Sequence, residues 1–515
     1  MIKLSGSLLA KFDGESTVAK NLNSVVAKLA QKDSTLWGPA AEAEAKIRMN
    51  WIDLPSSSRD LLPQLDALSV WVRSSNLTNF VLCGMGGSSL APEVIAKTFG
   101  KNLTVLDSTD PEQIRLAIPK DLNQTLVIVG SKSGSTIETA SQKSLFEKLF
   151  ADANLNPKDH FVIITDPKSP LDQSSRAAGL RVINADPNVG GRFSALSAFG
   201  LVPAAILGVD VSVLLDDAEI AARSFTDPDS SATKIATLIF ERTEQNFSLQ
   251  DRGSNVPGIG DWIEQLIAES TGKDQKGRLP IVVESEKSKV SGQALSIGFG
   301  NGKSDLNVMA SLGEHFILWE WVTALLCRAL EVDPFNQPNV TEAKERTGNL
   351  LELWDRQGRE DTQPSLKVDS MAIYGGANDA ELTEVLADLI ARSGKYLAIM
   401  AYLNREQDFE LVRLREAIAE KRNIGVTFGW GPRFLHSTGQ FHKGGAHNGG
   451  FLQITADCET DLAIPGKKFT FHELLMAQAL GDGEALSARK LPVVRIHLKN
   501  RSEGIAEILK AVAKL

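Results

Sequence analysis

The chain contains 515 residues, of which 43% are hydrophobic and 23% are charged, and its formal net charge is −9. Because this length exceeds one ordinary hydrophobic core, we expect two or three packed units. The negative balance, without any basic run, argues against nucleic acid or an anionic membrane as the main partner.

The cysteines and the apolar stretches indicate a cytoplasmic protein. Cys83, Cys327 and Cys458 are far apart and lack metal-ligand spacing, which is typical of reduced thiols. The first residues contain no sustained apolar segment and no cleavage pattern, so we expect no secretion. Residues 195–215 are apolar but interrupted by glycine and proline, which predicts a buried helix and not a membrane span.

The periodicity of apolar residues predicts strands and helices in alternation after a helical start. Residues 1–60 have helical spacing and no β-rich run. The next expected strands are 79–83, 103–106, 125–129, 161–165 and 181–183. A charged, helical stretch is expected at 218–252, and long helices at 314–330 and 342–359. The later expected strands are 279–283, 371–374, 396–400, 424–428, 451–454 and 493–496. This alternation predicts an α/β fold, with parallel sheets covered by helices on both faces.

The first candidate loop is 84–89, Gly-Met-Gly-Gly-Ser-Ser, between an expected strand and helix. Glycines allow a ligand to approach the backbone, and a helix N-terminus offers N–H groups to an anion. Asp107 lies about twenty residues on, as in a dinucleotide-binding fold, but Ser89 replaces the third glycine of that fingerprint. Taken alone, the loop is also compatible with a purely structural turn.

The second candidate loop is 131–139, Ser-Lys-Ser-Gly-Ser-Thr-Ile-Glu-Thr, which follows a strand and opens a helix. Its hydroxyls and ammonium form a donor-rich nest for a phosphate dianion, whereas a helix N-cap needs only one hydroxyl. Both loops leave the carboxyl ends of strands, where ligands of open α/β sheets bind. We therefore predict a phosphomonoester cradle made of Ser88, Ser131, Lys132, Ser133 and Thr136.

These loops resemble the sugar isomerase domain, and further segments resemble the phosphoglucose isomerase family. Residues 190–194 are similar to its Gly-Gly-Arg-aromatic-Ser signature, and 265–273 to its Gln-x-x-x-Glu-Ser-x-Gly-Lys segment. Residues 333–344 are similar to its Pro-Phe-Asp-Gln segment, with Asn336 in place of the usual Asp. Residues 436–440 resemble its His-Ser-x-x-Gln segment, and the region from about 371 is similar to the isomerase portion of transaldolase–phosphoglucose isomerase fusions.

The resemblance implies two sugar-isomerase (SIS)-type units. They would be a helical arm (1–60), a first domain with the phosphate loops (61–225), and a second domain with a C-terminal α/β extension (226–515). It also implies reversible isomerisation of glucose 6-phosphate and fructose 6-phosphate through a cis-enediol, within glycolysis and gluconeogenesis. Neither a cofactor nor a metal is implied.

Moving a carbonyl from C1 to C2 requires a base that carries a proton between neighbouring carbons, and a carboxylate suits that task. Glu269 is the expected base, with Gln265 one helical turn earlier on the same face. Arg192 is the expected cation for the enediolate, because it keeps its charge; a structural salt bridge is the alternative. Without the motif, a glutamate in this stretch would be read as part of a solvated face.

Ring opening requires a second proton-transfer pair, and the resemblance assigns it to Lys344 and His436. The common family order places the histidine before the lysine, whereas His436 follows Lys344. His442 is a competitor for this role, and His315 is interpreted as a packing or capping residue. The further expected substrate contacts are Gly87, Gln265, Gln337 and His442.

The resemblance also implies a homodimer in which each site receives the ring-opening histidine of the neighbouring subunit. The expected small-molecule partner is a sugar phosphate. Three alternatives stay open at this point: an isomerase for another phosphosugar, a non-catalytic phosphosugar-binding regulator, and a nucleotide-dependent oxidoreductase. The regulator would need the phosphate loops but not Glu269, Arg192 and Lys344.

Overall fold

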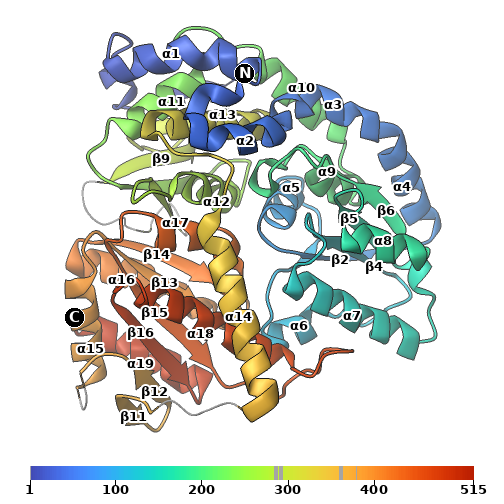
Figure 1. The fold of residues 1–515 in the computed structure, drawn as a ribbon, viewed down its shortest axis with the longest axis vertical. Coiled ribbons are helices and arrows are strands. Elements are labelled where there is room, and N and C mark those ends of the chain that lie inside the picture. Colours follow the sequence, from blue (N-terminus) through green and yellow to red (C-terminus); the bar gives the residue numbers. More distant parts are fainter. Residues whose placement is uncertain (1, 284–287, 289–293, 359–362, 378–379) are drawn as a thin grey trace.

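Three β-sheets, each covered by helices, organise the chain in the computed structural model (Figure 1). The structure describes residues 2–283, 288, 294–358, 363–377 and 380–515. We call the parts around the three sheets the first, second and third units, in chain order. The predicted α/β class is confirmed, because most neighbouring strands in all three sheets run parallel.

The first unit contains a five-stranded parallel sheet in the order β3-β2-β4-β5-β6. Its strands are β2 (Asn79–Gly84), β3 (Thr104–Leu106), β4 (Thr125–Gly130), β5 (Phe161–Thr165) and β6 (Arg181–Asn184). Its helices are α5 (Leu90–Thr98), α6 (Pro111–Ala117), α7 (Ile137–Asp152), α8 (Pro170–Ala177) and α9 (Ala198–Ile206). Strands β4 and β5 are buried throughout, as expected for parallel strands covered on both faces. The chain leaves β2 and β4 in opposite directions across the sheet, so their carboxyl ends form a topological switch point.

The second unit has the sheet order β1-β10-β9-β7-β8. Its strands are β1 (Lys3–Ser5), β7 (Asn246–Arg252), β8 (Leu279–Val283), β9 (Leu295–Gly300) and β10 (Leu306–Met309). Its helices, including the N-terminal arm, are α1 (Thr17–Ala30), α2 (Pro39–Arg48), α3 (Leu54–Ser57), α10 (Val211–Ala222), α11 (Ser231–Phe240), α12 (Ile259–Thr271) and α13 (Leu312–Leu330). Helix α4 (Leu62–Ser74) packs instead against α9 of the first unit.

Two expectations for this unit were wrong. The stretch 218–252 is not helical to its end, because its last seven residues form β7. This strand is buried although it contains polar residues: the Gln250 side chain donates a 3.0 Å hydrogen bond to the Ser248 hydroxyl inside the protein. The N-terminal arm is not wholly helical either, because β1 pairs antiparallel with β10.

The third unit has the sheet order β11-β12-β16-β15-β13-β14. Its strands are β11 (Leu366–Val368), β12 (Met371–Tyr374), β13 (Tyr396–Ala401), β14 (Gly425–Trp430), β15 (Gly449–Ala456) and β16 (Val493–Leu498). Its helices are α15 (Leu382–Arg392), α16 (Arg413–Arg422), α17 (Gly439–Gly444), α18 (Phe471–Ser487) and α19 (Arg501–Ala513). The range 226–515 therefore contains two separate sheets.

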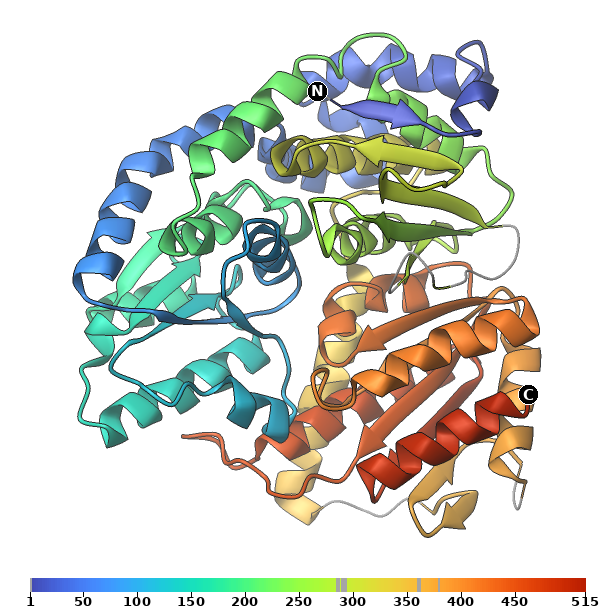
Figure 2. The ribbon, with the colours of Figure 1, turned by 180° about the vertical axis from the view of Figure 1, so that it is seen from behind.

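Helix α14 (Pro338–Gln357) crosses the molecule between the first and third units, and it packs against α17 and α18 (Figures 1 and 2). Apolar clusters continue across the unit boundaries. One joins the first sheet to Leu351 of α14 and Phe471 of α18, and another joins Ala268 of α12 to Tyr396 of β13. The loops that carry the predicted site residues meet where these boundaries converge.

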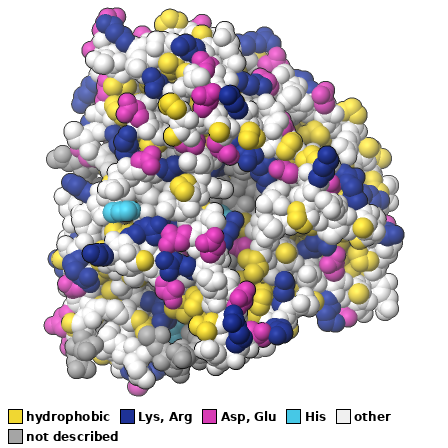
Figure 3. Space-filling model, viewed as in Figure 1, with side chains coloured by type: hydrophobic (Ala, Val, Ile, Leu, Met, Phe, Trp, Pro, Cys, Tyr) yellow, Lys and Arg dark blue, Asp and Glu magenta, His cyan; other side chains and the backbone are white. Residues whose placement is uncertain are grey.

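The surface mixes charges of both signs without a large field of either, on the face shown in Figure 3. No helix in the described part of the chain is both long enough and apolar enough to cross a membrane.

Candidate active site

Helix α12 carries Glu269 and Gln265 on one face, four residues apart as predicted. The Gln265 amide donates a 3.2 Å hydrogen bond to one carboxylate oxygen of Glu269. The same nitrogen donates a 2.7 Å hydrogen bond to the backbone carbonyl of His436, in the third unit. Both α12 side chains are buried. Gln265 therefore links the expected base to the turn that contains the expected ring-opening histidine.

Arg192 lies opposite Glu269, in a turn that follows two glycines. Its Nη1 is 3.4 Å from a Glu269 carboxylate oxygen, and its Nε donates a 2.7 Å hydrogen bond to the Ser270 hydroxyl. Its Nη2 donates to the backbone carbonyls of Pro334 and Asn336, just before α14. With a residue exposure of 4%, the guanidinium is fixed in place and cannot rotate freely. A buried cation held beside a buried carboxylate suits stabilisation of charge that develops during a reaction.

Gly87 is required by packing between two site loops. A Cβ atom at this position would lie 1.9 Å from the backbone oxygen of Gly191, next to Arg192. No side chain fits there without displacing the arginine turn. Gln337 lies at the start of α14, where its side-chain oxygen is 3.5 Å from Arg192 Nη1.

His436 meets Glu138 across the boundary between the third and first units. His436 ends the short helical turn Arg433–His436, and its Nε2 lies 3.0 Å from a Glu138 carboxylate oxygen. Gln478 of α18 donates a 2.7 Å hydrogen bond to that same oxygen. Burial raises the pKa of the Glu138 carboxyl, but His436, together with a backbone hydrogen bond and the charge of Lys344, holds the pKa below its usual value.

A cavity of about 240 Å³ lies beside this histidine. The residues that line it come from the start of α7, from α14, from the His436 turn and from α18. They include Thr136, Lys344 and His436, so three predicted residues from distant parts of the sequence share one cavity. Lys344 is exposed on α14 and faces this cavity.

The predicted phosphate loops lie at the switch point of the first sheet. The Ser131 hydroxyl donates a 3.1 Å hydrogen bond to that of Thr136. Ser88 lies over the ends of β2 and β4, because a Cβ added at Gly84 or Gly130 would lie 3.2 Å from the Ser88 Cβ.

Two other members of the predicted cradle point elsewhere. Lys132 forms a 2.6 Å ion pair with Asp166, which already engages its ammonium group. The Ser133 hydroxyl lies 3.0 Å from that of Ser135, in an exposed position. A phosphate would have to share Lys132 with Asp166.

His442 does not join the other predicted residues, because it lies in an aromatic cluster with Tyr396, Phe434 and Phe451. Burial, followed by the charge of Lys443, lowers the pKa of His442 to about 3. The imidazole therefore stays neutral within the core, and the geometry favours His436 for proton transfer. His315 also packs against an aromatic ring, that of Phe299.

Sequence reasoning gave no role to two buried site residues, although both lie inside segments that it singled out. Glu138 follows the hydroxyl-rich loop by two residues, and its position on the first turn of α7 was the available signal. Lys273 follows Glu269 by one turn, and its ammonium donates to the backbone carbonyl of Asp333. Burial, followed by the charge of Arg192, lowers the pKa of Lys273 to about 7. In the described part of the chain, no three His, Cys, Asp or Glu side chains are grouped to hold a metal ion.

Comparisons with known proteins agree on one family. Residues 60–241 match the family model described as phosphoglucose isomerase. A glucose-6-phosphate isomerase of Thermus thermophilus is 34% identical over 254 residues, which cover 46% of this chain and 59% of that protein. One of Campylobacter jejuni is 34% identical over 206 residues, which cover 38% and 51%. The chain thus spans only about half the length of the curated relatives it matches.

Among solved structures, the crystal structure of a glucose-6-phosphate isomerase from Chlamydia trachomatis has the same fold. Its TM-score is 0.56 at 16% identity, covering 69% of this chain and 89% of that one. The predicted SIS-type α/β fold is therefore confirmed at the level of fold class. The expected similarity to transaldolase fusions stays a prediction.

Proposed function

We propose that this chain, whose residues 60–241 match the phosphoglucose isomerase family model, interconverts glucose 6-phosphate and fructose 6-phosphate through a cis-enediol. The observation that carries the proposal is the buried pair of Glu269 and Arg192, which Gln265 connects to the His436 turn. Such a pair is costly to bury for stability alone, and it supplies a base and a fixed cation in one place.

In the proposed mechanism, Glu269 takes the proton from C2 of the open-chain aldose and returns it to C1. The proton of the O2 hydroxyl passes to O1 in the enediolate, so that the carbonyl moves from C1 to C2. The enediolate formed between these steps is negative, and the Arg192 guanidinium stabilises its oxygens. Because five protein acceptors already hold Arg192, its orientation does not have to be established during the reaction. Gln265 keeps the carboxylate of Glu269 turned toward the substrate.

Ring opening is assigned to His436 and Lys344, which line one cavity with Thr136. Glu138 holds the His436 imidazole through one ring nitrogen, which leaves the other nitrogen to exchange a proton with the sugar. Lys344, on α14, is the proposed proton donor to the sugar. The phosphate is held by the hydroxyls of Ser88, Ser131 and Thr136 at the N-terminus of α7.

His436 reaches Glu138 of the same chain. We therefore propose that catalysis does not depend on sharing this histidine between subunits. The homodimer itself stays a prediction. We further propose a cytoplasmic location, because Cys83, Cys327 and Cys458 are unpaired thiols.

The proposal is tested with fructose 6-phosphate and the purified, chelator-treated protein. We expect conversion to glucose 6-phosphate in a coupled assay, and incorporation of solvent deuterium at C2 of glucose 6-phosphate by NMR. Binding of the sugar phosphate without exchange would establish the regulator in place of the isomerase. A preference for mannose or amino-sugar phosphates would establish an isomerase for another substrate.

A further inference from the structure

Four charged side chains lie together, largely shielded from solvent, where the third unit meets the first. Glu93 of α5 and Asp107 at the end of β3 face Arg405, which follows β13, and Arg433, which begins the His436 turn. Their side-chain exposures are 12%, 1%, 18% and 14%. Asp107 is the acidic residue that resembled a dinucleotide-binding aspartate in the sequence. Here it contacts two arginines.

Arg433 makes the closer contacts of the two arginines. Its Nη1 lies 2.7 Å from a Glu93 oxygen and 2.9 Å from an Asp107 oxygen, which are distances of charge-assisted hydrogen bonds. Arg405 lies 3.5 Å and 3.6 Å from the same two carboxylates. Arg433 is therefore the main connection between these acids and the third unit.

The turn that Arg433 begins is the one that ends in His436. Three contacts hold it against the rest of the site: Arg433 to the two acids, the His436 carbonyl to Gln265, and the His436 ring to Glu138. The fit is close, because a Cβ added at Gly86 would lie 2.8 Å from the His436 carbonyl oxygen. A small displacement of this turn would therefore separate the imidazole from Glu138.

We infer that Arg433 is a positioning residue of the proposed isomerase: it fixes the Arg433–His436 turn on the first unit so that His436 meets Glu138. The inference rests on the proposed function. Arg433 makes no contact that the structure describes with Glu269 or the phosphate loops, but the Asp107 oxygen that it holds also accepts a 3.4 Å hydrogen bond from the Ser89 hydroxyl of the first loop. We expect its main effect on ring opening, because it begins the turn that carries His436. A lysine would reach one carboxylate as a point charge but would not present the planar fork of an arginine.

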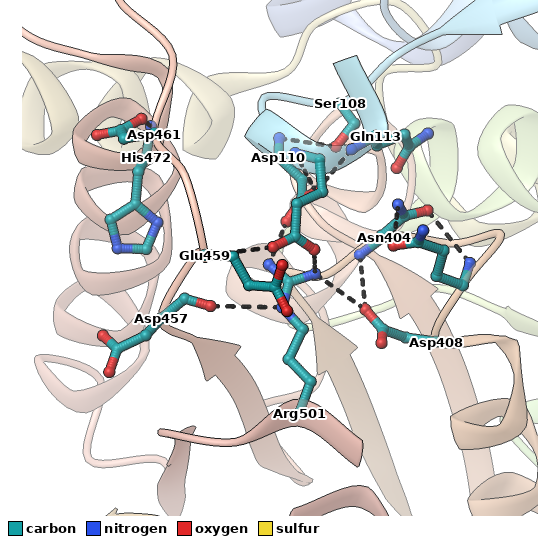
Figure 4. Close-up of polar contacts among 12 residues, drawn as sticks. Ser108, Asp110, Gln113, Asn404, Asp408, Asp457, Glu459, Asp461, His472 and Arg501 are labelled. Atoms are coloured by element: carbon teal, nitrogen blue, oxygen red, sulfur yellow. Dashed lines mark hydrogen bonds and ion pairs between the residues drawn. The ribbon is translucent and has the colours of Figure 1, made fainter. Parts of the chain in front are cut away.

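A second ion cluster joins the same two units without carrying a site residue. Figure 4 shows Arg501 between Asp110 of the first unit and Asp408 of the third, at distances of 2.8 Å and 3.1 Å. Glu112 is also 2.8 Å from Arg501. Because this second cluster also holds the units together, loss of Arg433 alone is expected to loosen one turn and not to separate the units.

The test compares Arg433→Gln with Arg405→Gln, a matched control that removes an arginine from the same two carboxylates but not from the His436 turn. For Arg433→Gln we expect kcat on fructose 6-phosphate to fall about 10- to 100-fold, because small misplacements of a reacting group cost rate on this scale. KM should change little. Interconversion of the α and β anomers of glucose 6-phosphate, measured by NMR, should slow in parallel with kcat. Arg405→Gln should keep nearly normal kcat.

A double-mutant cycle with His436→Ala separates positioning from a general structural role. If Arg433 acts through His436, Arg433→Gln lowers kcat no further in the His436→Ala background. If the double variant instead lost kcat by the product of the two single reductions, the two residues would act independently and the inference would be overturned. Arg433→Lys, which keeps a charge, should recover part of kcat, and it provides the measurement if Arg433→Gln fails to fold.

Failure of the inference is distinguishable from failure of the proposed function. If the wild-type protein does not isomerise fructose 6-phosphate, the proposed function fails before any variant is compared. If the wild type isomerises and Arg433→Gln behaves like Arg405→Gln, only the positioning role fails.

Discussion

The first and third sheets share a strand order but use their carboxyl ends differently. In the first sheet the order is β3-β2-β4-β5, and in the third it is β14-β13-β15-β16. In both sheets, the second parallel strand in chain order lies on one side of the first strand. The third and fourth parallel strands lie on the opposite side of that first strand. Each sheet therefore has a switch point of the kind where α/β proteins bind ligands, between β2 and β4 or between β13 and β15.

The loops at these two switch points are chemically unlike. In the first sheet they contain glycines and the hydroxyls of Ser88, Ser131 and Thr136. In the third sheet the corresponding edge lies against the first unit: Arg405 donates to the carbonyl of Val105, and Arg501 pairs with Asp110. Topology supplies the same crevice twice, and loop chemistry makes one a candidate binding site and the other an interface.

The largest expected effect on kcat comes from replacing the proposed base, Glu269, which lies at neither of these switch points. Glu269→Gln keeps the hydrogen bond with Gln265 but has no carboxylate to accept a proton from carbon. We expect kcat to fall by about 10²–10⁴-fold or more, with sugar phosphate binding retained. NMR of deuterium exchange at C2 measures this step directly.

Glu264→Gln on the same helix is the matched control for this prediction. Burial, followed by the charge of Asp261, raises the pKa of Glu264 well above its usual value, and glutamine keeps the shape of this side chain on the same helix. Its kcat should stay close to that of the wild type. Exchange at the wild-type rate in Glu269→Gln would assign the base to another residue.

The next effect tests what the third unit contributes. His436→Ala removes a ring-opening group, and we expect kcat to fall about 10²-fold or more. Because His436 and Glu138 belong to one chain, mixing His436→Ala with Glu269→Gln chains should restore no activity. Subunit exchange is checked first with differently tagged chains. Recovered activity would mean that the histidine is supplied by a partner, as the family resemblance implied.

The strands were predicted best where burial is complete, and least well where polar residues enter the core. Residues 125–129 form a run of apolar residues and were recognised, as was 161–165. β7 was missed because charged residues such as Glu244 and Arg252 made the stretch look helical, although Ser248 and Gln250 alternate with apolar residues as in a strand. β9 was missed because glycine occupies two of its positions.

In the site, contacts between residues close in sequence could be predicted, and contacts between distant residues could not. The pairing of Gln265 with Glu269 follows from their helical spacing, so it was accessible from the sequence. The pairing of Glu138 with His436 was not, because 298 positions separate them and they belong to different units. The aromatic surroundings of His442 were not accessible either, since only tertiary packing places its ring among three aromatic side chains.

A smaller effect, on ligand affinity, tests the phosphate loops at the switch point of the first sheet. Replacing Ser131 and Thr136 together by Ala removes two hydroxyl donors, each worth about 1.5–3 kcal/mol when the acceptor is charged. We expect the dissociation constants of fructose 6-phosphate and of inorganic phosphate to rise at least about tenfold. Isothermal titration measures both, and Ser174→Ala at an exposed position of α8 is the control. Unchanged affinity for both ligands would remove the cradle from the site.

The smallest effect tests the switch point of the third sheet, where a substitution should change the stability of the protein but not its turnover. Asp110→Asn retains the side-chain oxygen that accepts hydrogen bonds from the N–H groups of Glu112 and Gln113, so α6 keeps its cap. It removes one carboxylate from Arg501, which still has Glu112 and Asp408. We expect the free energy of unfolding to fall by about 1–3 kcal/mol, the usual worth of a hydrogen bond to a charged group.

Urea unfolding measures this loss against Asp152→Asn, which breaks the exposed pair of Lys148 and Asp152 and should cost less than about 0.5 kcal/mol. Turnover of Asp110→Asn on fructose 6-phosphate should match that of the wild type, because this cluster holds no site residue. A stable Asp110→Asn protein with strongly reduced kcat would mean that the switch point of the third sheet also serves the reaction. In that case the switch points of both sheets would contribute groups on which the reaction depends, and the third could not be described as an interface alone.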